Sequence, residues 1–305
     1  MTDRPPPPRR PVPEATLDRL HRQVLDWYAA HARPLPWRDP ATTPWGVFVS
    51  EVMAQQTPVA RVEPVWREWL TRWPTPAALA DATPGDAVRA WGRLGYPRRA
   101  LRLREAALTM VEQHGGAVPS TVEQLLALPG VGPYTAAAVS SFAHGLPVPV
   151  VDTNVRRVLA RALGGSALAA PSLTAAETRL AATALPADAS DALAWNVAAM
   201  ELGALVCTAR SPSCERCPIA DLCAWYAAGR PADDGPSRRG QAWAGTDRQA
   251  RGALVQALRA APGPLSGASL REAWPPEDQR LRCLDSLVAD GLVEPLSEGF
   301  FGLPR

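Results

Sequence analysis

Residues 128–135 read Leu-Pro-Gly-Val-Gly-Pro-Tyr-Thr and join a short helical pattern to a longer one. Gly130 and Gly132 allow the backbone to turn tightly and to direct free N–H groups outward at the start of the second helix. A helix end of this kind binds phosphate. A plain helical hairpin needs only one glycine, so both interpretations stay open on this segment alone.

An acidic residue follows the hairpin in an apolar setting. Residues 150–157 read Val-Val-Asp-Thr-Asn-Val-Arg-Arg, which suggests a strand-like run that ends at Asp152. Asn154 is placed to cap the next helix. An acid between apolar residues must be paired, capped or functional, so Asp152 is a candidate functional residue.

Four cysteines lie close together farther along the chain, at Cys207, Cys214, Cys217 and Cys223. The spacing C-x6-C-x2-C-x5-C lets one loop wrap one metal centre. Four thiolates suit a tetrahedral zinc ion as well as a [4Fe–4S] cluster, and spacing does not separate the two.

The composition of the 305-residue chain neither requires nor excludes a nucleic-acid partner, because its formal net charge is only +2. No apolar run approaches the roughly 20 residues that span a bilayer, and the N-terminus has no hydrophobic signal core. We therefore expect a cytoplasmic protein with no membrane partner.

Apolar periodicity predicts an all-helical region followed by a small second unit. Residues 1–13 are expected to be a disordered proline-rich arm, and the polar, aperiodic residues 229–246 a linker. Residues 247–305 carry three helical patterns and two short strand patterns, which suggests a winged helix. The earlier helical patterns cover residues 14–32, 45–56, 59–73, 84–94, 99–114, 122–128, 134–143, 154–162, 173–185 and 191–205.

The hairpin, the segment VDTNVRRVLAR at 151–161 and the cysteine loop, in this order, resemble the helix-hairpin-helix DNA glycosylases of the endonuclease III superfamily. The resemblance implies a mainly α fold, with an iron–sulfur helical module from residues 14–34 and 146–228 and a six-helix barrel from residues 35–145. The winged-helix-like α+β unit would follow at residues 247–305. The resemblance also implies that the four cysteines hold a [4Fe–4S] cluster.

Two positions separate the branches of this superfamily. A bifunctional enzyme forms a Schiff base through a lysine after the second hairpin glycine, and here Tyr134 stands in that place. The second position holds Glu51 in place of an amide-bearing segment. The segments LPWR at 35–38, SEVMAQQT at 50–57 and LGY at 94–96 resemble the adenine DNA glycosylases. That family removes adenine mispaired with 8-oxoguanine or guanine.

Adenine leaves when its N7 is protonated and the cationic sugar is stabilised, which calls for two carboxyls in different protonation states. Glu51, with apolar neighbours in sequence, is expected to be the protonated acid. Asp152 is expected to stay ionised and to face the sugar. The resemblance implies that Tyr134 and Asn154 assist this chemistry.

The target base must leave the duplex stack before it can react. The resemblance implies that Gln56 and Tyr96 insert into the duplex and that the hairpin glycines meet phosphate. It assigns the adenine pocket to Arg33, Leu35, Trp37 and Arg38. Leu35 and Trp37 are equally typical of a core, and the two arginines of solvated or phosphate-bound side chains.

The chain also departs from the family. Pro97 replaces a second tyrosine, Val197 stands where relatives carry Glu or Gln, and the small C-terminal unit replaces a larger Nudix-like domain. Whether this C-terminal unit binds DNA, binds a partner or only covers the catalytic module stays open. We expect a monomer that works in the nucleoid on double-stranded DNA with A:8-oxoguanine or A:G mispairs. The alternatives are a bifunctional glycosylase/lyase for oxidised pyrimidines and a non-catalytic iron–sulfur DNA-binding protein.

Overall fold

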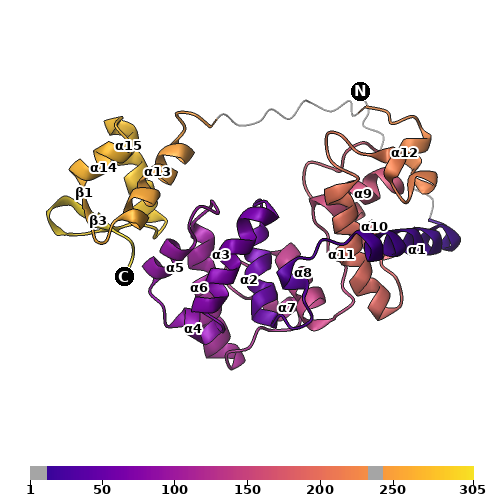
Figure 1. Cartoon of the computed structure of the whole chain (residues 1–305), viewed down its shortest axis with the longest axis horizontal. Coiled ribbons are helices and arrows are strands. Elements are labelled where there is room, and N and C mark those ends of the chain that lie inside the picture. Colours follow the sequence, from indigo (N-terminus) through magenta and orange to yellow (C-terminus); the bar gives the residue numbers. More distant parts are fainter. Residues whose placement is uncertain (1–11, 233–242) are drawn as a thin grey trace. The chain divides into compact units, whose positions relative to one another are not determined.

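The computed structural model describes residues 12–232 and 243–305. The described residues are mainly helical, as the sequence predicts, and group into two compact units. One unit joins residues 12–34 to residues 145–232, and the other joins residues 35–144 to residues 243–305 (Figure 1). Most of the expected arm (residues 1–11) and of the expected linker (residues 233–242) lies outside the described residues.

The unit that contains the hairpin begins with short helices separated by proline and glycine. Thr43, Thr75 and Thr83 each cap a helix whose first residue is proline, a residue with no N–H of its own to satisfy. Trp69 and Trp91 pack edge to face in the core, with ring centroids 5.7 Å apart. The elements are η1 (Pro36–Arg38), α2 (Pro44–Ala54), α3 (Val59–Arg72), α4 (Pro76–Ala80), α5 (Pro84–Ala90), α6 (Arg98–His114), α7 (Val122–Leu126) and α8 (Pro133–His144).

The second unit combines the N-terminal helix with helices from the middle of the chain. Leu20 and Val24 on α1 are fully buried among residues of α9 and α11, including Leu159 and Leu202. The N-terminal helix therefore completes a core whose other side lies after the hairpin. The elements are α1 (Glu14–His31), α9 (Thr153–Ala162), α10 (Ala175–Thr183), α11 (Ala189–Leu205), η2 (Cys214–Arg216), η3 (Ala220–Leu222) and α12 (Ala224–Ala227).

The strand-like run expected up to Asp152 is not a strand. Residues 145–152 have no regular structure. The N–H of Val150 donates to Oδ1 of Asn196 on α11, and the amide of Asn196 donates to the carbonyl of Val148. A side chain thus satisfies the backbone where a neighbouring strand would do so in a sheet.

The C-terminal part has the predicted three helices and a pair of short strands. A third strand, β1, joins them in an antiparallel sheet of order β1-β3-β2. Sequence reasoning missed β1 because it has two residues and thus shows no alternation. The elements are α13 (Asp247–Ala260), β1 (Leu265–Ser266), α14 (Gly267–Ala273), α15 (Glu277–Ala289), β2 (Glu294–Pro295), η4 (Ser297–Gly299) and β3 (Phe300–Gly302).

This C-terminal part packs on α5 of the same unit. Val88 of α5 belongs to the apolar core of the C-terminal helices. The N–H of Gly85 donates to the carbonyl of Pro304 at 2.7 Å, and a Cβ added at Gly85 would lie 2.4 Å from that oxygen. Glycine is therefore needed where the chain end meets α5. No helix among the described residues is long and apolar enough to cross a membrane.

Candidate functional site

Glu51 is a buried carboxyl on α2, with 8% of its surface exposed. Helix α2 is apolar on almost every face and is buried from Trp45 to Met53. Tyr134, in the first turn of α8, donates a hydrogen bond from its hydroxyl to Oε2 of Glu51 at 2.8 Å. Next to it, Nε2 of Gln55 donates to Oγ1 of Thr135 at 3.0 Å. The packing of α2 against α8 thus brings together the two side chains that the sequence singled out.

Asp152 is the N-cap of α9, whereas the sequence favoured Asn154 for that role. Asp152 has an extended backbone directly before the helix, while Asn154 already lies in its first turn. Oδ1 of Asp152 accepts from the N–H groups of Asn154 and Val155 at 2.8 and 2.7 Å, and Oδ2 accepts from Nδ2 of Asn154 at 2.7 Å. The capping bonds engage Oδ1 and the Asn154 side chain engages Oδ2, and together they fix the carboxyl in place.

The charge of Asp152 is set by two opposing effects. Burial raises the pKa of Asp152 above its usual range. The hydrogen bonds from Val155 and Asn154 act in the opposite direction because they favour the anion. Burial is the larger of the two effects, so the pKa of the carboxyl lies above its ordinary value.

A partly buried arginine links α9 to the cysteine loop. Nη2 of Arg157 donates to Oδ1 of Asn154 and to the carbonyl of Gly203, both at 2.7 Å. Its Nε donates to the carbonyl of Cys207 at 2.6 Å. A Cβ at Gly203 would lie 2.6 Å from Cβ of Asn154, so glycine allows α9 and α11 to approach. Sequence reasoning identified neither Arg157 nor Gly203.

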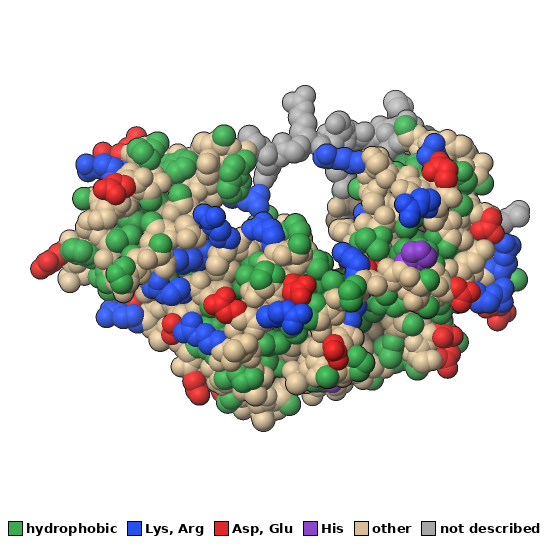
Figure 2. Space-filling model, viewed as in Figure 1, with side chains coloured by type: hydrophobic (Ala, Val, Ile, Leu, Met, Phe, Trp, Pro, Cys, Tyr) green, Lys and Arg blue, Asp and Glu red, His purple; other side chains and the backbone are tan. Residues whose placement is uncertain are grey.

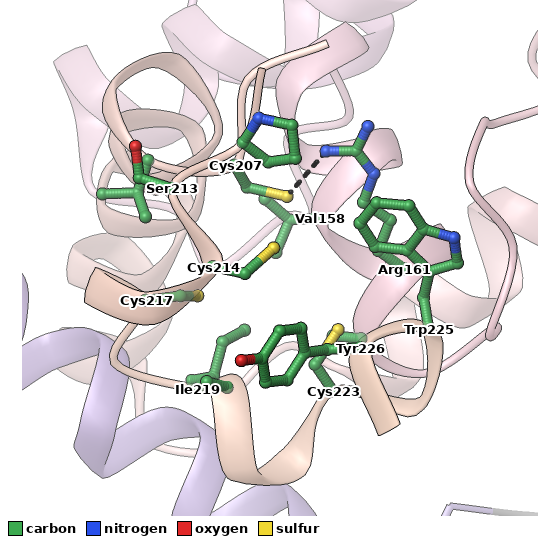
Figure 3. A pocket seen from close by; sticks show the side chains of 14 residues that line it. Val158, Arg161, Cys207, Ser213, Cys214, Cys217, Ile219, Cys223, Trp225 and Tyr226 are labelled. Carbon is green, nitrogen blue, oxygen red and sulfur yellow. Dashed lines mark hydrogen bonds between the residues drawn. The ribbon is translucent and has the colours of Figure 1, made fainter. Parts of the chain in front are cut away.

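The four cysteine side chains line one cavity (Figure 3). Among the described residues, no group of three or more His, Cys, Asp or Glu side chains is arranged to hold a single metal ion. A zinc ion needs its sulfurs about 2.3 Å away, whereas a cube of iron and sulfide occupies more space between its ligands. The four thiols share one cavity without the close arrangement that a single ion needs, so the donor set fits the larger centre.

The surroundings of the thiols also fit an iron–sulfur centre that is held by thiolates. Burial, with a smaller contribution from the neighbouring thiols, raises the pKa of Cys217 to about 12. Iron binding offsets that cost because it stabilises the thiolate form. Arg161, which is 3% exposed, donates from Nη1 to Sγ of Cys207 at 3.3 Å and lies over the ring of Trp225 at 4.6 Å.

The two residues expected to insert into a duplex occupy strained turns. Gln56 has φ +53° after α2, and Tyr96 has φ +47° after α5, a region that side chains other than glycine rarely adopt. Both are exposed, Tyr96 to 45%. A residue held in this region needs support from its surroundings.

Arg99, which sequence reasoning missed, supplies that support. Its Nη1 donates to the carbonyls of Val52 and Gln55 at 2.9 and 2.7 Å, at the C-terminal end of α2. Its Nη2 donates to Oγ1 of Thr57 and to the carbonyl of Gly95, both at 3.1 Å. One guanidinium therefore ties the Gln56 turn to the Tyr96 turn. Burial lowers the pKa of Arg99 to about 10, so the group stays charged at neutral pH.

The two hairpin glycines differ in whether the fold requires a glycine at their position. Gly130 has φ +76°, and a Cβ there would lie 2.6 Å from Cβ of Arg102. Gly132 has an ordinary φ, and a Cβ there would meet nothing within 4 Å. The fold therefore requires glycine at 130 only, and the surface in front of 132 is open at the start of α8.

The residues expected to line the base pocket have varied surroundings. Arg33 donates from Nε and Nη2 to the two carboxylate oxygens of fully buried Glu201, at 2.7 and 2.8 Å. This hydrogen bonding raises the pKa of Arg33. Trp37 packs edge to face on Trp66 at 5.8 Å and belongs to the edge of the barrel core. Leu35 and Arg38 flank it, partly buried.

Glu201 is a further buried acid that the sequence could have indicated. It has apolar neighbours in the second half of helix α11, the same signal that singled out Glu51 and Asp152. Its side chain is fully buried, so without a cation its charge would be costly. Arg33 provides that cation.

Comparison with known proteins gives consistent relatives. Residues 49–182 match the HhH-GPD superfamily of base excision DNA repair proteins, and residues 207–223 match the iron-sulfur binding domain of endonuclease III. The chain is 51% identical over 298 residues to an adenine DNA glycosylase of Mycobacterium tuberculosis, covering 96% of this chain and 97% of the relative. It is 50% identical over 282 residues to an adenine DNA glycosylase of Mycolicibacterium smegmatis, covering 92% and 94%.

Solved structures share the fold. A thermostable thymine-DNA glycosylase is 27% identical with a TM-score of 0.63, over 70% of this chain and 98% of that one. A non-covalent endonuclease III–DNA complex is 22% identical with a TM-score of 0.61, over 72% and 98%. The matched shares leave a part of this chain without a counterpart in either structure.

Proposed function

The chain belongs to the adenine DNA glycosylases, and from that premise we propose that it excises adenine paired with 8-oxoguanine or guanine, with Glu51 and Asp152 as its catalytic carboxyls. It is a DNA glycosylase of base excision repair and carries a [4Fe–4S] cluster. The identity of the mispair, the roles of the residues, a monomeric state and a place in the cytoplasm at the nucleoid belong to the proposal.

The hydrogen bond between Tyr134 and Glu51 carries this proposal. The phenol stands where a lyase of the superfamily has its amine, and it orients the carboxyl of a buried helix. Glu51 delivers a proton to N7 of the extruded adenine, so that the base leaves as a neutral molecule. Tyr134 holds Oε2 while the other carboxyl oxygen faces the base.

Asp152 stabilises the positive charge that develops on the sugar as the base leaves. Its capping bonds prevent the carboxylate from turning away, and burial leaves its charge weakly screened. Asn154 completes the set of donors from its side chain. Gln56 and Tyr96 fill the space of the extruded nucleotide, and the open surface at Gly132 takes a backbone phosphate.

The four cysteines that line the cavity are the proposed ligands of the cluster. When bound, the cluster supplies four covalent links that order the loop from residue 207 to residue 223. Arg157 connects this loop to Asn154, so loop order also bears on the donors around Asp152. Residues 14–34 and 146–228 are the proposed iron–sulfur module and residues 35–145 the barrel.

The sequence supports a monofunctional enzyme. All 32 Lys and Arg residues are arginine, so this sequence contains no lysine side chain. A Schiff base with the sugar needs an amine that can lose its proton, and a guanidinium does not do so near neutral pH. Strand cleavage should therefore appear only after the abasic product is heated in alkali.

The test is single-turnover adenine release from duplexes that contain A:8-oxoguanine, A:G, A:C or A:T. Release from the first two pairs, with strand cleavage only after alkali, is the expected result. Glu51→Gln should lower release by roughly 100-fold or more because a general acid contributes about that much. Glu112→Gln, the same change at an exposed residue of α6, is the matched control. Full release by Glu51→Gln would contradict the proposed acid, and binding without any release would favour the non-catalytic alternative.

A further inference from the structure

An arginine of the C-terminal part lies on the side chain of Tyr96. Nη2 of Arg248, in the first turn of α13, donates to the Tyr96 hydroxyl at 2.8 Å. The guanidinium carbon lies 4.8 Å from the centroid of the Tyr96 ring and 5.5 Å from that of Trp243. Two parts of the chain far apart in sequence thus meet at the residue proposed to enter the duplex.

The charge of Arg248 is not neutralised by an acid in the described part of the chain. Its neighbours in the C-terminal part differ in this respect, because Arg251 pairs with Asp290 at 2.5 Å and Arg282 pairs with Asp247 at 2.8 Å. Asp247 directly precedes Arg248 but directs its oxygens to Arg282 and Gln279. Arg248 therefore keeps its full positive charge beside Tyr96.

This charge lies on an accessible aromatic surface. Tyr96 is 45% exposed and Trp243 is 55% exposed, and Arg248 is exposed as well. Planar cationic and aromatic groups together suit stacked bases and phosphates. Further basic side chains lie on the visible face of the molecule (Figure 2).

We propose that Arg248, with Trp243 beside it, binds a backbone phosphate of the duplex next to the mispair and sets the position of the Tyr96 ring. The first residues of the C-terminal part then extend the duplex-binding surface of the barrel. The inference rests on the proposed insertion of Tyr96. The inference does not require that the C-terminal part recognises the base opposite adenine.

The geometry explains why an arginine is suited to this position. One edge of the guanidinium bonds the Tyr96 hydroxyl, which leaves other N–H donors for a phosphate oxygen. Its face meanwhile lies on the two rings. A lysine would keep the charge but lose the planar contact.

The experiment measures duplex affinity against salt for the full-length protein that retains its cluster. The probe is a duplex with a tetrahydrofuran abasic-site analogue opposite guanine, followed by fluorescence anisotropy between 50 and 200 mM KCl. Loss of one phosphate contact makes the negative slope of log affinity against log salt shallower by about 0.9. The ratio of wild-type to variant affinity should therefore fall roughly 3.5-fold between 50 and 200 mM KCl. Arg248→Ala and Arg248→Gln should both show this change. Arg271→Ala, at an exposed arginine of α14, is the control and should not.

Two further variants separate the charge from the contact with Tyr96. Arg248→Lys should keep the wild-type salt slope but bind more weakly at every salt concentration. The loss caused by Arg248→Ala should become smaller in a Tyr96→Phe background, because the hydroxyl partner is already gone. A purely structural role of Arg248 would change thermal stability and leave the salt slope as it is.

An unchanged salt slope in both Arg248 variants would overturn the inference, as would an equal change in Arg271→Ala. Full additivity with Tyr96→Phe would overturn the positioning of the ring. These outcomes do not depend on adenine release. If the Arg248 variants differ from the wild-type protein in salt slope while the wild-type protein releases no adenine, the proposed function is contradicted and the phosphate contact still holds.

Discussion

Replacing Arg99 with methionine tests whether one guanidinium holds both duplex-inserting turns. The change keeps the apolar stem of the side chain and removes its donors to the end of α2, to Thr57 and to Gly95. At about 1 kcal/mol net for each of these four bonds, the free energy of unfolding should fall by about 4 kcal/mol. Trp91 lies 5.2 Å from the guanidinium, so tryptophan fluorescence during urea unfolding reports on the site.

The activity of the same variant should fall for a geometric reason. Gln56 and Tyr96 stay in their positive-φ conformations only while the surroundings hold them, and each such conformation costs about 1–3 kcal/mol. Once the tie is lost, adenine release under single-turnover conditions should drop by roughly tenfold or more. Adenine release slows because part of the free energy of duplex binding must then be used to order both turns.

The matched control is the neighbouring Arg98, which is half-exposed and forms a surface ion pair with Asp290 at 3.1 Å. Arg98→Met should cost no more than about 1 kcal/mol and leave release nearly unchanged. If Arg99→Met proved as stable and as active as Arg98→Met, the link between the guanidinium and the two turns would be refuted.

Three further changes probe the carboxyls and the cysteine loop. Tyr134→Phe removes the donor to Glu51 and should slow adenine release about five- to tenfold at unchanged duplex affinity, as measured by single-turnover kinetics and anisotropy. Burial already raises the pKa of Asp152, and Asn154→Ala removes a bond that favours its anion, so the acid limb of the rate–pH profile should move to higher pH. An unmoved limb would argue against Asp152 as the group that must be ionised. Arg161→Met removes a buried charge beside the thiols and should lower absorbance near about 400 nm per protein, with an iron assay as the check.

Periodicity predicts the long helices of this chain well and its short elements badly. The pattern at 99–114 corresponds to α6 at Arg98–His114, which ends at Gly115 with φ +61° as a helix-stopping glycine should. Helix α4 has five residues and was not predicted, since so short a segment completes barely one turn. At such lengths periodicity is a weak guide: the pattern at 122–128 indicates the equally short α7, whereas α4 depends on the cap of Thr75 and on packing against α6.

The candidate carboxyls could be found from sequence because a lone acid among apolar residues is conspicuous. Their local geometry could not. The sequence places Asp152 and Asn154 two residues apart, and both are good N-cap residues, so composition alone does not say which one precedes the helix. The choice depends on where the irregular segment before α9 ends, and Asn196 on a distant helix fixes that point.

The arginines mark the limit of sequence reasoning, because their partners are backbone carbonyls. Arg99 binds carbonyls at the end of α2, Arg157 binds the carbonyl of Gly203 near the end of α11, and Arg104 binds those of Ala80 and Ala82 after α4. The last carbonyls of a helix have no partner within it, and a guanidinium with several donors can satisfy more than one of them.

A helical-stripe pattern treats each of these arginines as a solvent-facing position, since it records side-chain polarity and not the location of unpaired carbonyls. The same arginines hold the turns of Gln56 and Tyr96 and the donors around Asp152. Residues that the sequence presents as surface charge therefore fix the geometry of the site. All basic residues of this chain other than histidine are arginine. The arginines most easily misinterpreted as surface charge are therefore those that fix the geometry of the site.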